Sequence, residues 1–225
     1  MDQSGARACI GSAGIMTIAK KFFRNRLLLA STVMAFSALT TAFGMRLLIR
    51  FDETPGISGK TLSRWPDRTR VGRVRDHFQL LIFAHPGCSC TAATIEELAI
   101  LLARPSSHAE VRPAITIIAA GAQASPASIP WWESFRRIGR AELVWDKDGA
   151  EARRFGARVS GDVFLFNARG ELVFRGGLTG SRGHIGDNYG LANLAAALES
   201  GRPAPQAQPV FGCALTAENS QEVRQ

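Results

Sequence analysis

Three of the four cysteines lie where sulfur chemistry is possible, and two of them are close together in the sequence. Cys88 and Cys90 fall in the segment HPGCSC (residues 85–90), which follows an apolar run and precedes residues with helical spacing. Unpaired N–H groups and the positive end of a helix dipole at such a turn stabilise a thiolate and lower the pKa of a cysteine. We therefore expect Cys88 to be the more exposed sulfur and the nucleophile, with Cys90 as its resolving partner.

Cys213 offers a different pairing. It lies in the carboxyl-terminal tail, in the motif VFGC, and it could form a disulfide with Cys88 or with Cys90 across the fold. A structural bridge with one spare thiol is the alternative, and the sequence leaves the connectivity open. Cys9 precedes the apolar segment described below, and we expect it to be cytoplasmic.

Histidines and a glycine-rich loop could assist the sulfur chemistry. His85 precedes the cysteine pair by three residues, where its ring would stabilise the thiolate or face solvent. His184 lies in a polar loop, residues 176–188, with six glycines in or beside it. In this loop His184 is a candidate proton shuttle, Arg182 an anion contact and Asp187 the residue that orients the histidine. The alternative is a turn-rich connection whose polar side chains bond to their own backbone.

Alternating strands and helices are predicted to position these residues. Continuous apolar runs at 78–84 and 114–120 indicate buried strands, and the residues between them have helical spacing over 89–104. The later elements are expected in this order: a helix at 128–140 with Pro130 in its first turn, a strand at 142–145, a helix at 148–155 ended by Gly156, hairpin strands at 162–166 and 171–174, and a helix at 191–198. This order predicts the α/β class, with a mixed, mainly parallel sheet that helices cover on both faces and an antiparallel hairpin at its edge.

The amino-terminal part predicts a single membrane span. Residues 27–45 carry no charge, lie between basic residues on both sides, and are long enough as a helix to cross a hydrocarbon core of roughly 30 Å. The basic residues before the span predict an amino terminus in the cytoplasm and a carboxyl-terminal domain outside the cytoplasmic (inner) membrane. Cleavage as a signal peptide near residues 42–44 and a buried helix of a soluble protein are the alternatives.

The chain is therefore expected to have five parts. They are a cytoplasmic extension (1–26), a transmembrane anchor or signal (27–49), a linker (50–75), an α/β domain (76–200) and a tail with Cys213 (201–225). Of the formal net charge of +8, residues 1–50 contribute most, since they hold seven basic residues and one acidic residue, which leaves +2 for the remainder. Basic residues gathered around an apolar segment indicate membrane topology, and nucleic acid is not an expected partner.

Residues 76–200 resemble the thioredoxin-like superfamily, with the cysteine pair on the first strand-to-helix turn and a hairpin late in the domain. The motifs HPGCSC, SRGHIGDNYG and VFGC are similar to those of the small membrane-anchored proteins called RedB. The resemblance implies a thioredoxin-like fold and a thiol–disulfide oxidoreductase that needs no organic cofactor and acts on protein thiols or disulfides outside the cytoplasm. The implied roles are nucleophile for Cys88, resolving cysteine for Cys90 or Cys213, and proton transfer for His85 or His184.

Two features differ from thioredoxins, which have Cys-x-x-Cys and a cis-proline before the hairpin. Here one residue separates the pair, and residues 159–162 contain no proline. Two other functions therefore stay open. Two close thiolates and a distant histidine suit copper, and the Sco copper chaperones are similar in outline, so that Cys88, Cys90 and His184 would be copper ligands. The other alternative is a non-catalytic protein that keeps the thioredoxin fold.

Overall fold

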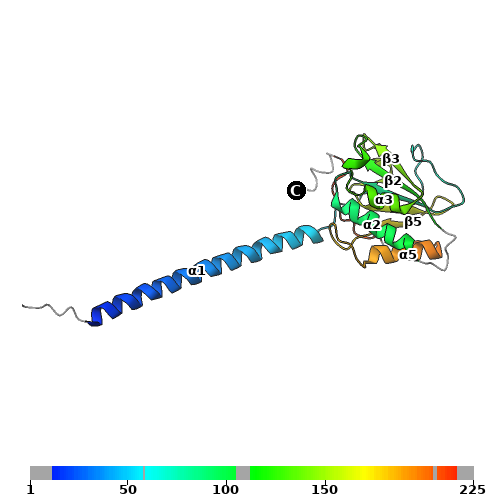
Figure 1. Cartoon of the computed structure of the whole chain (residues 1–225). Coiled ribbons are helices and arrows are strands. Elements are labelled where there is room, and N and C mark those ends of the chain that lie inside the picture. The colour runs from blue at the N-terminus through cyan, green and yellow to red at the C-terminus, as the bar shows by residue number, and fades with distance from the viewer. Residues whose placement is uncertain (1–11, 58, 105–111, 205–206, 217–225) are drawn as a thin grey trace, which may run out of the picture. The chain divides into compact units, whose positions relative to one another are not determined.

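The computed structural model describes residues 12–57, 59–104, 112–204 and 207–216, and it divides the chain into two compact units, residues 1–51 and 52–225. Cys9 lies outside the described residues. The described part of the first unit is a single helix, α1 (Ser12–Glu53), whose last residues pass into the second unit (Figure 1).

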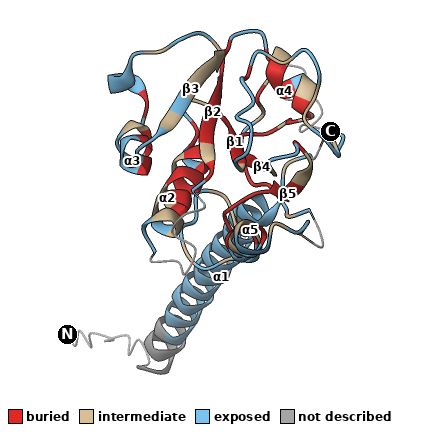
Figure 2. Cartoon of the chain, turned by 90° about the vertical axis from the view of Figure 1, so that its right-hand side faces the viewer, coloured by how far each residue is buried: buried red, intermediate tan, exposed pale blue. Residues whose placement is uncertain are grey.

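Helix α1 has the length and composition of a membrane span. Its segment Lys20–Glu53 is 34 residues long, and an apolar window in it has a mean hydropathy of 1.7 with none of it buried. Almost all of its described residues are coloured as exposed in Figure 2. The exposed residues include large apolar ones such as Phe22, Leu29 and Met34. Such a helix suits a lipid environment, although a signal sequence meets the same criteria. The prediction of one amino-terminal helix that is long and apolar enough to cross a membrane is confirmed.

The second unit is built on a mixed five-stranded sheet with the order β3-β2-β1-β4-β5. Strands β1 (Gln79–Ala84), β2 (Ala114–Ala120) and β3 (Ala141–Asp146) are parallel, whereas β4 (Asp162–Phe166) and β5 (Leu172–Gly176) form an antiparallel hairpin that pairs with β1. The helices are α2 (Ser89–Ala103), the 3₁₀ helix η1 (Pro126–Ser128), α3 (Trp132–Ile138), α4 (Ala150–Phe155) and α5 (Tyr189–Ser200). This topology is thioredoxin-like, and the predicted fold class is confirmed.

Helices cover both faces of the sheet, with α2 and α3 on one side and α4 on the other (Figure 2). The side chains of β1 alternate between two cores, because successive residues of a strand point to opposite faces. Ile82 lies in one core with Ile95 of α2 and Leu194 of α5. Phe83 lies in the other, with its ring 5.6 Å from that of Phe155 in α4. Because β1 is buried at every position, the turn at its carboxyl end starts from a rigid strand.

One predicted element differs from the structure. The sequence predicts a single helix at 128–140 with Pro130 in its first turn, but the chain forms η1 and then begins α3 only at Trp132. A proline has no backbone N–H and restricts the residue before it, so Pro130 separates the two helical segments. As a result Trp131 is fully buried, beside the turn that carries two of the cysteines.

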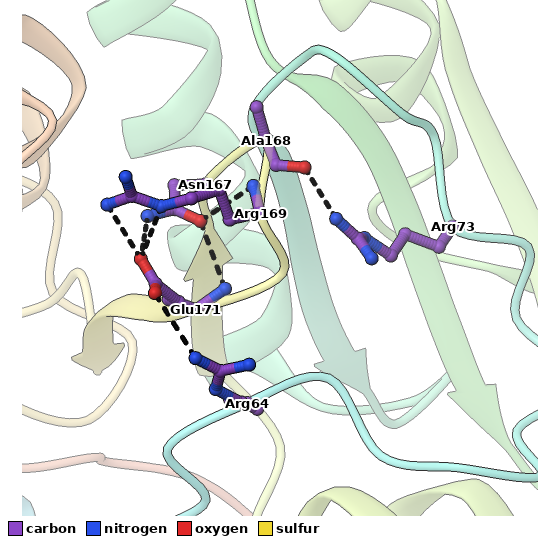
Figure 3. Close-up of polar contacts among 6 residues, drawn as sticks. All are labelled: Arg64, Arg73, Asn167, Ala168, Arg169 and Glu171. Atoms are coloured by element: carbon purple, nitrogen blue, oxygen red, sulfur yellow. Dashed lines mark hydrogen bonds and ion pairs between the residues drawn. The ribbon is translucent and has the colours of Figure 1, made fainter.

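Polar side chains at the surface hold the turn of the β4–β5 hairpin (Figure 3). Asn167 accepts hydrogen bonds from the backbone N–H groups of Arg169 and Glu171, at 2.9 and 3.0 Å. The Glu171 carboxylate accepts hydrogen bonds from the side chains of Asn167 and Arg169, which lower its pKa. It also forms an ion pair with the exposed Arg64 at 3.5 Å, so the segment that precedes β1 is attached to the hairpin.

A second ion pair of the hairpin is buried. Nη2 of Arg175 lies 2.9 Å from Oδ2 of Asp162, and both side chains are almost completely inaccessible. Arg175 also donates hydrogen bonds to the carbonyl oxygens of Lys60 at 2.9 Å and Gly156 at 2.7 Å. Burial raises the pKa of Asp162 to about 6, although the Arg175 guanidinium opposes that rise. The pair therefore joins both hairpin strands to distant loops.

We predict that Arg175→Met lowers the free energy of unfolding by about 3–5 kcal/mol, because it leaves the Asp162 carboxylate buried without its cation. Urea unfolding of the full chain in detergent measures the change at about pH 8, where Asp162 is ionised. Tryptophan fluorescence reports on the second unit, since all four tryptophans lie there. Arg64→Met, which breaks the exposed pair, is the control and should change little. Equal effects of the two substitutions would contradict the prediction.

Candidate functional site

The turn after β1 is held by its own backbone. Cys88 directly precedes α2 in an extended conformation, and its N–H donates a hydrogen bond to the His85 carbonyl at 3.1 Å. The same carbonyl accepts a hydrogen bond from Nε1 of Trp131 at 3.3 Å, and the N–H of His85 donates to Oγ1 of Thr91 at 3.1 Å. The turn is therefore fixed on two sides, and it places Cys88 at the amino-terminal end of α2, where the helix dipole favours a negative charge.

The carboxyl-terminal tail brings Cys213 to this turn. The N–H of Ser160 donates to the Cys213 carbonyl at 2.8 Å, and the N–H of Leu215 donates to the Arg158 carbonyl at 3.0 Å. Gly212 passes so close that a Cβ atom there would lie 1.8 Å from the Ser160 carbonyl oxygen. Only a glycine permits this approach, and it sets Cys213 beside the segment that leads into β4.

The sulfur atoms of Cys88 and Cys213 are hydrogen bonded and lie 2.9 Å apart. A disulfide bond is about 2.05 Å long, so the two sulfurs need to approach by less than ~1 Å to form one. The hydroxyl of Ser160 bridges the two residues: it donates to the Cys88 sulfur at 3.1 Å and accepts from the Cys213 N–H at 2.9 Å. Two cysteines that lie 125 positions apart in the sequence are thus brought into one contact.

Of the three cysteines, Cys88 is the one whose thiol loses its proton most readily. The pKa of Cys88 is lowered to about 3, chiefly by a hydrogen bond from the Cys90 thiol and further by those from Cys213, Ser160 and the Thr91 backbone, against the effect of burial. The same contact with Cys88, together with burial, raises the pKa of Cys90. Burial and the neighbouring Cys88 raise the pKa of Cys213 to about 11. Near neutral pH the reduced site therefore holds one thiolate, at Cys88, and two thiols.

The exposure of the cysteines differs from the prediction. The sequence predicts that Cys88 is the more exposed sulfur, but Cys88 is 2% exposed and Cys90 is 3% exposed. Cys213 is the exposed cysteine of the three. The prediction for Cys88 is wrong: Gly87 and Ser89 on either side of it are exposed, but its own sulfur lies against the Cys213 sulfur and the Ser160 hydroxyl.

Neither candidate histidine forms a hydrogen bond to a cysteine among the contacts of the described residues. His85 is half-buried, and its buried Nδ1 has no hydrogen-bond partner in that part of the chain. His184 is exposed, and its N–H donates to the Ser181 carbonyl at 3.4 Å. Asp187, expected to orient that histidine, forms an ion pair with Arg104 at 4.0 Å. A role for either histidine in proton transfer stays a prediction.

Arg182 connects the glycine-rich loop after β5 to the site. Its Nη1 donates a hydrogen bond to the Gly212 carbonyl at 2.7 Å, and its Nη2 donates to the Thr54 carbonyl at 3.3 Å. The guanidinium charge also acts to lower the pKa of Cys213, though less than burial raises it. The loop therefore supports the tail residue that precedes Cys213, which is a different role from the anion contact that the sequence suggests.

Ser160 is a site residue that sequence analysis missed. It is fully buried, and its hydroxyl contacts both Cys88 and Cys213. Serine is common in turns, so its residue type gives no signal. Its position was the available clue, because residues 159–162 occupy the place before the hairpin where thioredoxins carry the proline that faces their cysteines.

We predict that Ser160→Ala raises the pKa of Cys88 by about one to two units. A hydrogen bond to a charged group contributes about 1.5–3 kcal/mol, and one pKa unit corresponds to about 1.4 kcal/mol. Titration of the thiolate ultraviolet absorbance in the reduced full chain measures this pKa. Ser128→Ala is the matched control, since the Ser128 hydroxyl is exposed and bonds to the Ser125 carbonyl. An unchanged titration in Ser160→Ala would show that the hydroxyl does not stabilise the thiolate.

Among the described residues, no group of three or more His, Cys, Asp or Glu side chains is arranged so that it could hold a metal ion. Cys88, Cys90 and His184, the ligands expected for copper, are therefore not assembled as a set. The groups around the Cys88 sulfur are thiols, a hydroxyl and a backbone N–H. These are hydrogen-bond donors, which suit a thiolate that reacts with other sulfur atoms.

Comparisons with known proteins support the fold. No protein-family model matches the chain, and no curated protein sequence matches it. An uncharacterized conserved protein from Geobacillus kaustophilus aligns over 73% of this chain and 92% of its own, with 19% identity and a TM-score of 0.50. A hypothetical protein from Sinorhizobium meliloti 1021 aligns over 73% of this chain and 96% of its own, with 21% identity and a TM-score of 0.50.

Among the other solved structures that align is a secreted disulfide oxidoreductase from Mycobacterium tuberculosis, described as homologous to E. coli DsbE. It aligns over 56% of this chain and 83% of its own, with 15% identity and a TM-score of 0.39. A likeness this distant carries no argument about function. The chemistry of the site therefore has to be argued from the residues of this chain.

Proposed function

We propose that the chain is a membrane-anchored thioredoxin-like thiol–disulfide oxidoreductase whose redox pair is Cys88 and Cys213. The observation that carries the proposal is the 2.9 Å contact between their sulfur atoms. Two further features support it. The Cys88 pKa is strongly lowered, as in reactive cysteines, and Cys213 is exposed, which gives a partner access to the pair.

The proposed reaction transfers two electrons and needs no organic cofactor. When Cys88 and Cys213 join, two electrons pass to a partner disulfide, which takes up two protons as it becomes two thiols, and the reverse reaction oxidises the partner. Cys90 stays a thiol, because a buried sulfur with a raised pKa is a poor nucleophile. In this proposal Cys88 is a redox cysteine, whereas Cys90, its resolving partner in the sequence prediction, only donates a hydrogen bond to Cys88. His85 and His184 remain candidates for the proton transfer.

We place the second unit outside the cytoplasm, with α1 as the anchor in the inner membrane. The basic residues before the apolar segment favour this orientation. An oxidising compartment also suits a pair that must form a disulfide during its cycle. The resemblance to RedB-like proteins fits the same arrangement, and protein thiols or disulfides outside the cytoplasm are the proposed partners.

Disulfide mapping tests the proposed pair. The full chain, purified in detergent, is equilibrated in glutathione buffers of increasing oxidising strength, quenched in acid, and its cysteines are mapped by mass spectrometry. The proposal predicts a bond between Cys88 and Cys213 and a free thiol at Cys90 over a range of buffers. A bond between Cys88 and Cys90 would overturn the proposal, and so would free thiols at Cys88, Cys90 and Cys213 in every buffer.

A further inference from the structure

The two sulfurs of the proposed pair differ in access. Cys213 is exposed, whereas Cys88 is 2% exposed and its sulfur lies against that of Cys213. Exchange requires the attacking sulfur to reach the sulfur that it attacks. A partner that approaches from solvent therefore meets Cys213 first, since Cys88 is almost completely inaccessible.

The two sulfurs also differ in how a negative charge on each is stabilised. The Ser160 hydroxyl donates to the Cys88 sulfur at 3.1 Å, and Cys88 lies at the amino-terminal end of α2. These groups are held in place before any reaction occurs. Cys213 has the opposite setting: the residue as a whole is exposed, but the partial burial of its sulfur and the nearby Cys88 raise its pKa to about 11. In thiol–disulfide exchange the sulfur with the lower thiol pKa is the better leaving group.

Access and charge thus assign different roles to the two sulfurs. We infer that a partner thiolate attacks the Cys213 sulfur of the disulfide, that Cys88 leaves as the thiolate, and that the protein thereby oxidises a dithiol substrate. The inference rests on the proposed Cys88–Cys213 pair and adds to it the order of bond formation and the direction of electron flow. It reverses the sequence prediction, in which Cys88 forms the bond with the partner.

The reaction balances over two steps. In the first, a bond forms between the partner sulfur and Cys213, the bond between Cys213 and Cys88 breaks, and Cys88 keeps the electron pair. In the second, the other thiol of the partner loses its proton to solvent and attacks the first partner sulfur, and Cys213 leaves and takes up a proton. Counted from two partner thiols, the first of which loses its proton to solvent before the attack, the partner has lost two electrons and two protons. The protein has gained two electrons and one proton, with Cys88 as a thiolate and Cys213 as a thiol. A dithiol, such as a reduced polypeptide with two neighbouring cysteines, completes both steps.

A trapped intermediate tests which sulfur is attacked. The full chain carrying Cys9→Ser and Cys90→Ser is oxidised in detergent, and formation of the Cys88–Cys213 bond is verified by mass spectrometry. Excess glutathione, a monothiol, is then added for a short time, the reaction is quenched in acid, and the protein is denatured and labelled with N-ethylmaleimide. We expect glutathione on Cys213 and the maleimide on Cys88, in at least a tenfold excess over the opposite pattern.

The possible outcomes separate the inference from the proposed function. Glutathione on Cys88, or equal labelling of the two cysteines, overturns the inference and leaves the redox pair in place. Failure of the protein to form the Cys88–Cys213 bond at the start overturns the proposed function itself.

Equilibrium with glutathione tests the direction of electron flow. A pair that oxidises dithiols should be reduced more readily than glutathione disulfide, because the Cys88 thiolate stabilises the reduced form. The ratio of reduced to oxidised protein, measured by acid quenching and mass spectrometry across glutathione buffers, gives the equilibrium constant. A pair that is harder to reduce than glutathione disulfide would contradict the direction, whichever cysteine carries the glutathione in the trapping experiment.

Discussion

Cys88→Ser is expected to reduce disulfide exchange to the background rate of the reagents, while Cys90→Ser retains turnover. Serine at position 88 can neither form the bond to Cys213 nor leave as a thiolate, so no two-electron cycle remains. Serine at position 90 keeps a hydroxyl that can still donate to Cys88, and the redox pair stays intact. Single-turnover oxidation of a synthetic dithiol peptide by the oxidised full chain, followed by loss of peptide thiols, measures the difference.

The comparison between these two variants is the decisive part of that experiment. Each variant replaces one buried sulfur atom with oxygen in the same turn. The two variants differ only in the position of this replacement, 88 or 90. If both variants lose activity equally, Cys90 belongs to the redox pair and the Cys88–Cys213 assignment fails. If Cys88→Ser keeps the wild-type rate, the site has no redox role. Tryptophan fluorescence of each variant shows whether the fold is preserved.

The stability of the reduced protein relative to the oxidised protein is expected to rise with pH between about 3 and 9. The Cys88 thiol has a pKa of about 3 in the folded chain, against an ordinary value of 9.0. Between these values the unfolded reduced chain binds one proton more than the folded chain, so the free energy of unfolding rises by up to about 1.4 kcal/mol per pH unit. This contribution is lost as the pH falls toward 3. The oxidised protein has no Cys88 thiol, so its free energy of unfolding lacks this pH-dependent contribution.

The disulfide favours the oxidised protein instead, and it raises the free energy of unfolding of that form by an amount that does not depend on pH. Closing a loop of 125 residues in the unfolded chain stabilises the oxidised fold by about 5 kcal/mol in the chain-entropy model. We therefore expect the oxidised protein to be the more stable form near pH 3, its advantage to fall by up to about 1.4 kcal/mol per pH unit, and the reduced protein to be the more stable form above about pH 7. Asp162, whose pKa is raised to about 6, titrates in both forms and cancels from the difference.

Urea unfolding of the oxidised and reduced full chain, followed by tryptophan fluorescence at a series of pH values, measures this difference. The reduced Cys88→Ser variant is the control, since it has no thiol at this position and should lack the additional pH slope. Parallel pH profiles for the oxidised and reduced wild-type proteins would show that the Cys88 thiolate does not contribute to stability.

Much of the fold could be predicted because its signals are local. The run at 114–120 is apolar at consecutive positions, as a strand buried on both faces requires, and β2 occupies the same residues. Gly156 ends α4 in the left-handed conformation (φ 73°), which a glycine adopts readily. The helix predicted at 128–140 has Pro130 in its first turn, where a proline is tolerated, but Pro130 instead lies between η1 and α3. The prediction is wrong about where the helix begins, because a proline has no backbone N–H and restricts the residue before it.

The candidate site was predictable only in part, because half of it depends on contacts far apart in the sequence. The place of Cys88 before α2 follows from the strand and helix patterns on either side of it. The approach of Cys213 depends on the path of an irregular tail, which no periodic pattern specifies. That path requires the absence of a side chain at Gly212 and the backbone pairing with Ser160. The burial of Cys88 was missed as well, because its sulfur lies against Cys213 and Ser160, two residues far from it in the sequence.

The tail that carries Cys213 lies beyond the last element of the sheet-and-helix framework, since α5 ends at Ser200. The tail is nevertheless part of the packed domain, because Val210 and Phe211 are buried and Leu215 lies in the same core as Phe155. The N–H of Gly56 also donates a hydrogen bond to the Val210 carbonyl at 2.7 Å. A chain shortened after α5 would therefore lose core contacts together with the proposed redox partner of Cys88, so folding and the proposed chemistry depend on the same segment.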